Sequence, residues 1–146
     1  MTFEKLVAQR KLVAEPTGRD EIEGLRALVR RSIADSAIEA LSADGRFERA
    51  YSAARALATM VVRAAGYRVR QPGGHYNTFL GLEAADPQAF SSYAAYFDKC
   101  RVLRNVISYE AADVISEAEL EEILGKVPEL EAIVESWLSK NHPGLA

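Results

Sequence analysis

Five polar side chains recur at helical spacing in a segment that is otherwise rich in valine, leucine and isoleucine: Arg101, Arg104, Asn105, Ser108 and Tyr109. Residues three or four positions apart are neighbours on a helix, so Arg101, Asn105 and Ser108 share one face, and Tyr109 follows Asn105 by one turn. A guanidinium makes bidentate contacts with phosphate, and a tyrosine ring can stack on a base. The spacing predicts a site for a phosphate-bearing ligand, unless Glu or Asp from a neighbouring helix neutralises the arginines.

The rest of this segment is apolar over much of the helix circumference. Arg104 and Tyr109 lie about 140° apart around the axis, at roughly 100° per residue, so they flank a groove rather than stack. The remaining faces carry four aliphatic side chains: Val102, Leu103, Val106 and Ile107. We expect such a helix to pack on more than one side, which leaves the polar patch partly desolvated. An arginine in that position needs an anion or hydrogen-bond acceptors.

Three residues elsewhere in the chain are further candidates for this site. His75 follows Gly73-Gly74 near an expected helix start, where free backbone N–H groups can hold an anion. It is either a phosphate contact or displaced general base, or a loop histidine that caps the following helix. Tyr51 and Arg55 are one turn apart on an earlier helix, and they either reach the polar stripe or serve only as core and surface residues.

The net charge of −3 is unevenly distributed along the chain. Residues 46–104 carry nine basic and four acidic side chains, a balance of +5, whereas residues 105–146 carry two basic and nine acidic ones, a balance of −7. A phosphate would prefer the middle segment. The alternative interpretation is that the two segments attract each other within the fold.

Several classes of protein are disfavoured by what the sequence lacks. It has no phosphate-binding Walker loop, no Gly-x-Gly-x-x-Gly and no His-Glu-x-x-His, and its two histidines are not at metal-ligand spacing. A single cysteine, Cys100, excludes an internal disulfide and a cysteine-based zinc site. No apolar run approaches the roughly 18 residues of a membrane span, and no signal peptide is evident, so we expect a cytoplasmic protein without a cofactor or metal.

The 146 residues are enough for one domain, and the alanine-rich composition favours helices. Apolar spacing predicts a short opening helix over 3–13 that Pro16 stops, a long helix from 17 or 18 to 41, and a third from about 46 to 65 that Gly66 caps. A loop at 72–74 precedes a short helix over 76–84.

A further long helix begins at Asp86-Pro87 and includes the polar stripe. Ser116 and Glu119 read as a capping box for a last helix, which Pro128 should kink or split and which ends before 141–144. No strand-like alternation longer than a few residues is evident. The expected fold is therefore all-α, a single domain over 1–146 built as an antiparallel up-down bundle of four long helices plus short ones.

Three segments together resemble the HEPN superfamily, a group of small all-α bundles: RFERAYSAARALATMVVRAAGYR, PGGHYNTF and YFDKCRVLRNVISYE. The resemblance spans residues from about 20 to 138. It is strongest to a bacterial branch with an Arg-Asn-x-x-x-Tyr motif on a late helix, which here is Arg104 to Tyr109.

The resemblance implies a homodimer that binds RNA or a nucleotide and belongs to a toxin–antitoxin or defence-type system. Many HEPN proteins are metal-independent RNases with an Arg-x4-6-His motif at a composite dimer site. Others are nucleotide-binding or non-catalytic, and many act beside a small nucleotidyltransferase. Arg104 matches the motif arginine and Asn105 the polar residue after it, whereas Tyr109 stands where the histidine would be.

That tyrosine changes the chemistry that the resemblance implies. With a reference pKa near 10, Tyr109 would need its pKa lowered by roughly three units, or about 4 kcal/mol, to act as a base at neutral pH. Two alternatives therefore stand beside the binding function. One is an endoribonuclease that uses Tyr109 or His75, and the other is a non-catalytic dimerisation or interaction module. A related alternative makes Tyr109 the target of a partner nucleotidyltransferase.

Overall fold

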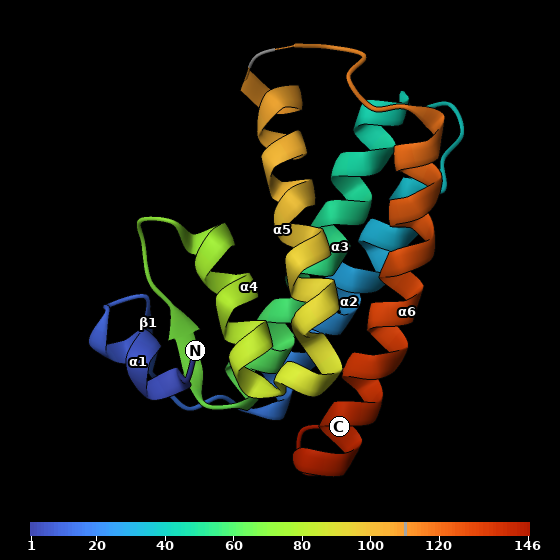
Figure 1. The fold of residues 1–146 in the computed structure, drawn as a ribbon. Coiled ribbons are helices and arrows are strands. Elements are labelled where there is room, and N and C mark those ends of the chain that lie inside the picture. The colour runs from blue at the N-terminus through green and yellow to red at the C-terminus, as the bar shows by residue number, and fades with distance from the viewer. Residues whose placement is uncertain (110) are drawn as a thin grey trace.

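The computed structural model describes residues 1–109 and 111–146, and within them the chain forms six helices and one two-stranded sheet (Figure 1). In chain order the elements are α1 (Phe3–Ala8), β1 (Leu12–Ala14), α2 (Arg19–Ser36), α3 (Ala43–Ala64), β2 (Tyr67–Val69), α4 (Gly74–Ala85), α5 (Pro87–Tyr109) and α6 (Glu117–Asn141). The fold is mostly helical, as the sequence predicted.

Helix α3 lies at the centre of the molecule and packs against α2, α4, α5 and α6 (Figure 1). A helix that is buried on most sides must be apolar nearly all round. Its many small side chains let the neighbouring helices approach closely, and they are fully buried: Ala50, Ala53, Ala54, Ala56 and Ala58. Larger aromatic residues from α3, α4 and α5 fill the space between the helices: Phe47, Tyr51, Phe79, Phe90 and Phe97.

The predicted helix ends are largely confirmed. Gly66 follows α3 with a φ of 97°, a conformation that favours glycine. The Asp86 carboxylate accepts a hydrogen bond from the Ala89 backbone N–H at 3.2 Å and so caps α5. Ser116 and Glu119 form the reciprocal capping box of α6. Pro128 lies inside α6 and does not split it.

The expected helix over 3–13 was wrong in its second half, because α1 ends at Ala8. Arg10 has a φ of 59°, and the chain then continues as β1, which pairs antiparallel with β2 in the register Leu12↔Val69. The buried Leu12 side chain packs with Leu6 and Val62 in a small second core. These three-residue strands are too short to show alternation in the sequence, and the fold as a whole remains all-α as predicted.

The second predicted helix is also shorter than its apolar spacing suggested. Helix α2 ends at Ser36, and the side chains of Ile38 and Leu41 are exposed rather than part of the core. The Ser42 hydroxyl accepts from the Gly45 N–H at 3.0 Å, so α3 begins at Ala43, before the predicted position 46. The Ser42 cap therefore accounts for the earlier start of α3.

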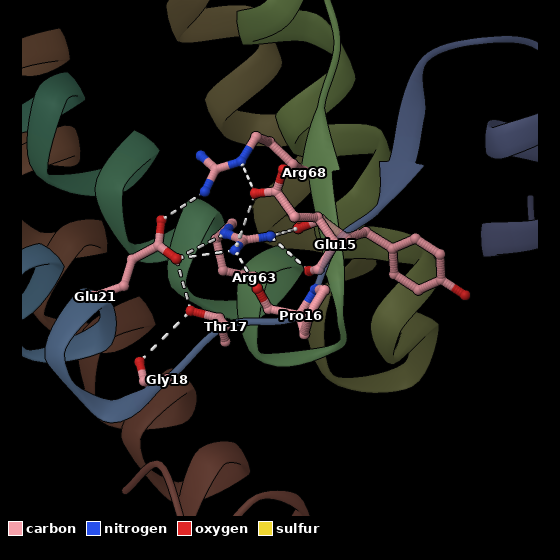
Figure 2. A network of polar contacts seen from close by, with 8 residues as sticks. Glu15, Pro16, Thr17, Gly18, Glu21, Arg63 and Arg68 are labelled. Atoms are coloured by element: carbon pink, nitrogen blue, oxygen red, sulfur yellow. Dashed lines mark hydrogen bonds and ion pairs between the residues drawn. The ribbon is translucent and has the colours of Figure 1, made fainter.

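Arg63 ties the end of α3 to the segment before α2 (Figure 2). Its side chain is 2% exposed and donates to the Glu21 carboxylate at 2.9 Å. It also donates to the backbone carbonyls of Glu15, Pro16 and Tyr67, at 2.8 to 2.9 Å. Hydrogen bonds from Arg63, and also from Thr17 and Arg68, lower the pKa of the Glu21 carboxyl to about 2. Arg63 is therefore a structural arginine whose charge the fold already neutralises.

None of the helices in the described part of the chain is both long enough and apolar enough to cross a bilayer.

Candidate functional site

A polar pocket of about 290 Å³ lies between the start of α4 and the C-terminal half of α5, and we call it the α4–α5 pocket. Helix α5 runs back alongside α4, which brings these two segments together (Figure 1). Its lining consists of Gln71, Gly73, Gly74, His75, Tyr76, Arg101, Arg104, Asn105 and Tyr109. Five of the six site residues predicted from the sequence are in this lining, and Ser108 is not.

Arg104 is partly buried in this pocket. Within residues 1–109 and 111–146, its guanidinium makes no hydrogen bond and no ion pair. Arg63, by contrast, donates to a carboxylate and three carbonyls. All the N–H donors of such a partly desolvated guanidinium are available to an external anion.

Arg101 is neutralised in part within its own helix. Its Nε donates to the Asp98 carboxylate at 2.7 Å, one turn earlier on α5. The guanidinium also lies over the ring of Tyr76, 5.4 Å from the ring centroid. Arg101 therefore lines the pocket and pairs with a carboxylate of its own helix, not with one from a neighbouring helix as the sequence-based alternative had it.

Ser108 and Tyr109 differ in their placement. The Ser108 hydroxyl donates to Glu48 on α3 at 2.7 Å, which directs it to an interhelical contact outside the pocket lining. The Tyr109 side chain is 79% exposed and lines the pocket from the last position of α5. Its ring is thus open to a ligand that approaches from solvent.

His75 is held by Tyr51, which lies on the central helix α3. The Tyr51 hydroxyl and His75 Nδ1 are 3.0 Å apart, and the two rings stack with an interplanar angle of 18°. Burial raises the pKa of Tyr51 to about 12, so its phenol keeps its proton at neutral pH. Burial and the charges of Arg55, Arg104 and Arg101 lower the pKa of His75 to about 4. His75 is therefore a neutral hydrogen-bonding group at pH 7.

Arg55 on α3 adds a third positive charge that acts on this region, although its side chain lines a separate hollow between α2 and α3. It is the first of the three arginines whose field acts on both Tyr51 and His75. Its Nε is buried and has no hydrogen-bond partner among the described residues. Sequence spacing placed Arg55 one turn after Tyr51 but left its role open, because only the packing of α3 against α4 and α5 brings it toward His75.

The loop that begins α4 contributes backbone donors. The Gly74 N–H donates to the Gln71 side chain at 3.1 Å, and the Asn77 N–H to the Gly73 carbonyl at 2.8 Å. In the described structure the N–H groups of His75 and Tyr76 have no partner. They point from the first turn of a 12-residue helix, the end that carries a partial positive charge.

Asn77 holds this loop in place and was not identified from the sequence. Its side chain is 3% exposed and donates to the backbone carbonyls of Arg70 and Pro72, at 3.0 and 3.2 Å. Gly73 adopts a φ of 82°, and a Cβ at Gly74 would come within 2.2 Å of the Gln71 side chain. The one available signal was the Pro72-Gly73-Gly74 turn, which predicts a loop but not the residue that fixes it.

The pocket combines guanidinium groups and free backbone N–H groups on one concave surface, with the Asp98 carboxylate paired to one arginine. Guanidinium groups and the N–H groups of a helix start are donors that proteins use to hold phosphate and other oxyanions. Across the described residues, no three His, Cys, Asp or Glu side chains gather closely enough to hold a metal ion. Comparison of the chain with protein-family models, curated proteins and solved structures finds no match.

Proposed function

We propose that the chain is a HEPN-like protein that binds RNA or a nucleotide through a phosphate group in the α4–α5 pocket. The observation that carries the proposal is the guanidinium of Arg104, which lines the pocket without a carboxylate partner among the described residues. Arg55 and Arg101 reinforce the positive potential there, as their effect on His75 indicates. Arg104 binds the phosphate, Asn105 orients it, and the exposed Tyr109 ring stacks on a base.

The HEPN proposal includes an antiparallel up-down bundle formed by the long helices α2, α3, α5 and α6, and a homodimer formed through α5. From position 101 onward, α5 has no fully buried residue, although it carries four aliphatic side chains: Val102, Leu103, Val106 and Ile107. The Val102 side chain is 52% exposed. Leu103 and Ile107 already pack against the core of their own chain, so a second copy packed against this half of α5 would bury mainly Val102 and Val106 and would bring two pockets together.

The remaining parts of the proposal come from the HEPN resemblance. The protein acts in the cytoplasm of a bacterium, in a toxin–antitoxin or defence-type system, with a nucleotidyltransferase as partner protein. The exposure of Tyr109 supports the related proposal that the partner modifies its hydroxyl. Mass spectrometry after co-expression with such a partner would show the mass of one added nucleotide, and Tyr109→Phe would abolish it.

Filter binding with labelled RNA tests the binding function. Arg104→Ala should weaken binding about tenfold or more, since a hydrogen bond to a charged group contributes about 1.5–3 kcal/mol. Arg31→Ala is the matched control, because Arg31 is an exposed arginine on α2 and its loss changes the net charge equally. Equal affinities for the two variants would contradict the assignment of the site.

A metal-independent endoribonuclease is the second candidate, and the position of His75 favours it. Although Tyr109 replaces the motif histidine, His75 lies in the same pocket as Arg104 and Asn105. In the proposed reaction the RNA 2′-oxygen bonds to phosphorus, the bond to the 5′-oxygen breaks, and His75 takes the 2′ proton while water protonates the leaving oxygen. A bound phosphate would offset the arginine charges and so make His75 more basic than in the free protein.

Incubation with mixed RNA in EDTA at pH 6–9 distinguishes the candidates. The endoribonuclease produces cyclic-phosphate ends with the wild type and none with His75→Asn. If the wild type binds RNA but does not cleave it, only the binding function is supported. A stable dimer that binds neither RNA nor nucleotide would instead favour the non-catalytic interaction module.

A further inference from the structure

A second hollow adjoins the α4–α5 pocket at Tyr76. It has a volume of about 140 Å³ and lies between α4 and the N-terminal half of α5. Its walls are mostly apolar and include Phe79, Ala94 and Ala95. The Tyr76 ring belongs to both hollows, and the Arg101 guanidinium lies over that ring while it pairs with Asp98, which lines the second hollow.

We infer that this second hollow is a base-binding subsite that selects guanine, so that the two hollows together accept one guanine nucleotide unit of RNA or a free guanine nucleotide. The inference rests on the proposed function, because the α4–α5 pocket must hold the phosphate of the same unit. Along α5, Asp98 and Arg104 are six residues apart, a rise of about 9 Å. The phosphate and the base therefore lie beside neighbouring turns of α5.

The size and walls of the hollow fit a planar ring. An apolar cavity of about 150 Å³ accommodates benzene, so a hollow of this volume takes the six-membered ring of a base. The Tyr76 ring is 41% exposed, and Lys11 as well as Arg101 lies within 6 Å of it. A base would pack against this aromatic edge and the apolar floor, which excludes water from its polar groups.

The polar groups of the hollow select the base. Glu83 and Asp98 are its two carboxylates, and carboxylates only accept hydrogen bonds. Asp98 already accepts from Arg101, whereas the Glu83 side chain has no hydrogen bond or ion pair in the described part of the chain. Guanine offers two adjacent donors, the ring N1–H and the 2-amino group, which match the two oxygens of one carboxylate. Uracil offers a single N–H between two carbonyls, which a carboxylate would repel.

Binding of short RNAs tests this assignment. The probes are pentaribonucleotides of uridine with guanosine, inosine or uridine at the centre, since inosine lacks only the 2-amino group. Wild-type protein should bind the guanosine pentamer about tenfold more tightly than the inosine pentamer, and the uridine pentamer least. Glu83→Gln should remove most of that preference. Glu121→Gln, at an exposed position on α6, is the matched control and should keep it.

A second variant tests the shape of the hollow without changing charge. Ala95 is exposed and lines the hollow, so Ala95→Leu should fold normally and occlude the space for the base. It should bind all three pentamers with the same reduced affinity. Arg104→Ala should weaken all three by one common factor and leave the preference for guanosine unchanged.

The outcomes separate the two proposals. Equal wild-type affinity for the three pentamers, or a guanosine preference that both Glu83→Gln and Ala95→Leu retain, would overturn the base subsite and leave the phosphate site standing. Binding of GMP without binding of any pentamer would identify a free nucleotide as the ligand, whereas no binding of GMP, of any pentamer or of longer RNA would overturn both.

Discussion

The guanidinium of Arg63 donates to the Glu21 carboxylate and three backbone carbonyls, whereas that of Arg104 has no partner in the described residues. An arginine is thus structural at position 63 and a candidate anion ligand at position 104. The hydrogen-bond acceptors around each guanidinium make this difference. A buried arginine with all its donors used is part of the fold, and its removal leaves acceptors unpaired. A partly buried arginine beside two others adds repulsion to the free protein and attraction to an anion.

Unfolding in urea should distinguish these two arginines. Arg63→Ala should lower the free energy of unfolding by about 3–5 kcal/mol, because three carbonyls lose their donor and the Glu21 carboxylate keeps only Thr17 and the exposed Arg68 as partners. Arg104→Ala should leave stability unchanged or raise it slightly, since it removes a positive charge near Arg55 and Arg101. A large loss of stability in Arg104→Ala would show that this arginine has a structural partner.

The His75 ring should make stability depend on pH between about 4 and 6.5. Its pKa is about 4 in the folded protein and 6.5 in the unfolded chain, so the unfolded chain binds the proton first. The free energy of unfolding is therefore highest above pH 6.5 and decreases as the pH falls toward 4. The decrease is at most about 2 kcal/mol after solvent screening.

The free energy of unfolding of His75→Asn should not show this decrease at low pH. Comparing its stability with that of the wild type across this pH range isolates the contribution of His75. Inorganic phosphate at millimolar concentration should reduce the wild-type loss, because an anion in the pocket offsets the arginine charges. Parallel profiles for the two proteins over pH 4–6.5 would contradict the low pKa of His75.

At the scale of elements, the site depends on the loop before α4, which the side-chain amide of Asn77 holds in place. The Asn77 side chain fixes the carbonyls of Arg70 and Pro72, and so sets the position of the first turn of α4. On α5 the spacing of Arg101, Arg104 and Asn105 within one helix is enough to bring them to the same pocket. Elements thus position the two sides of the site by different means, one by helical periodicity and the other by a buried hydrogen-bonded turn.

Asn77→Ala should therefore affect both stability and binding. We expect a loss of about 1–3 kcal/mol in the free energy of unfolding, because the buried Asn77 amide and its hydrogen bonds to two loop carbonyls are lost. RNA affinity should also fall severalfold as the N–H groups of His75 and Tyr76 lose their fixed position. Asn105→Ala is the contrasting variant, with weaker binding and nearly unchanged stability. Loss of stability alone in Asn77→Ala would contradict a role of this loop in binding.

The sequence predicted those features that depend on near neighbours. The caps at Asp86 and Ser116, the glycine after α3 and the polar face of α5 are each encoded within about one turn of chain. The pairing of β1 with β2 joins residues far apart in three-residue strands, which leave no periodic signal. The contact between Tyr51 and His75, and the approach of Arg55, also arise only when α3 packs against α4 and α5.

At the scale of the whole molecule, α3 forms the scaffold and α5 completes the site on one side of it (Figure 1). The C-terminal half of α5 has little cover from α6 compared with the cover that α2 and α6 give to α3. An apolar helix face without cover in one chain is a candidate for contact with another chain. The proposed homodimer is the assembly that would supply this cover.

Sedimentation equilibrium should detect that assembly. The wild type should have the mass of a dimer at micromolar concentration, and Val102→Glu should have the mass of a monomer, because it places a charge in the proposed contact. Ser92→Glu, at an exposed position in the N-terminal half of α5, should remain dimeric. A wild-type monomer over the whole concentration range would contradict the homodimer.

The chain's single cysteine, Cys100, is 2% exposed, and burial raises the pKa of its thiol to about 11. It should therefore resist alkylating reagents at neutral pH while the protein is folded. A second cysteine introduced on the surface would then accept a spin label or fluorophore selectively, without first removing the native thiol. Pulsed magnetic resonance between the labels of two copies would report how far apart the two pockets lie in the proposed homodimer.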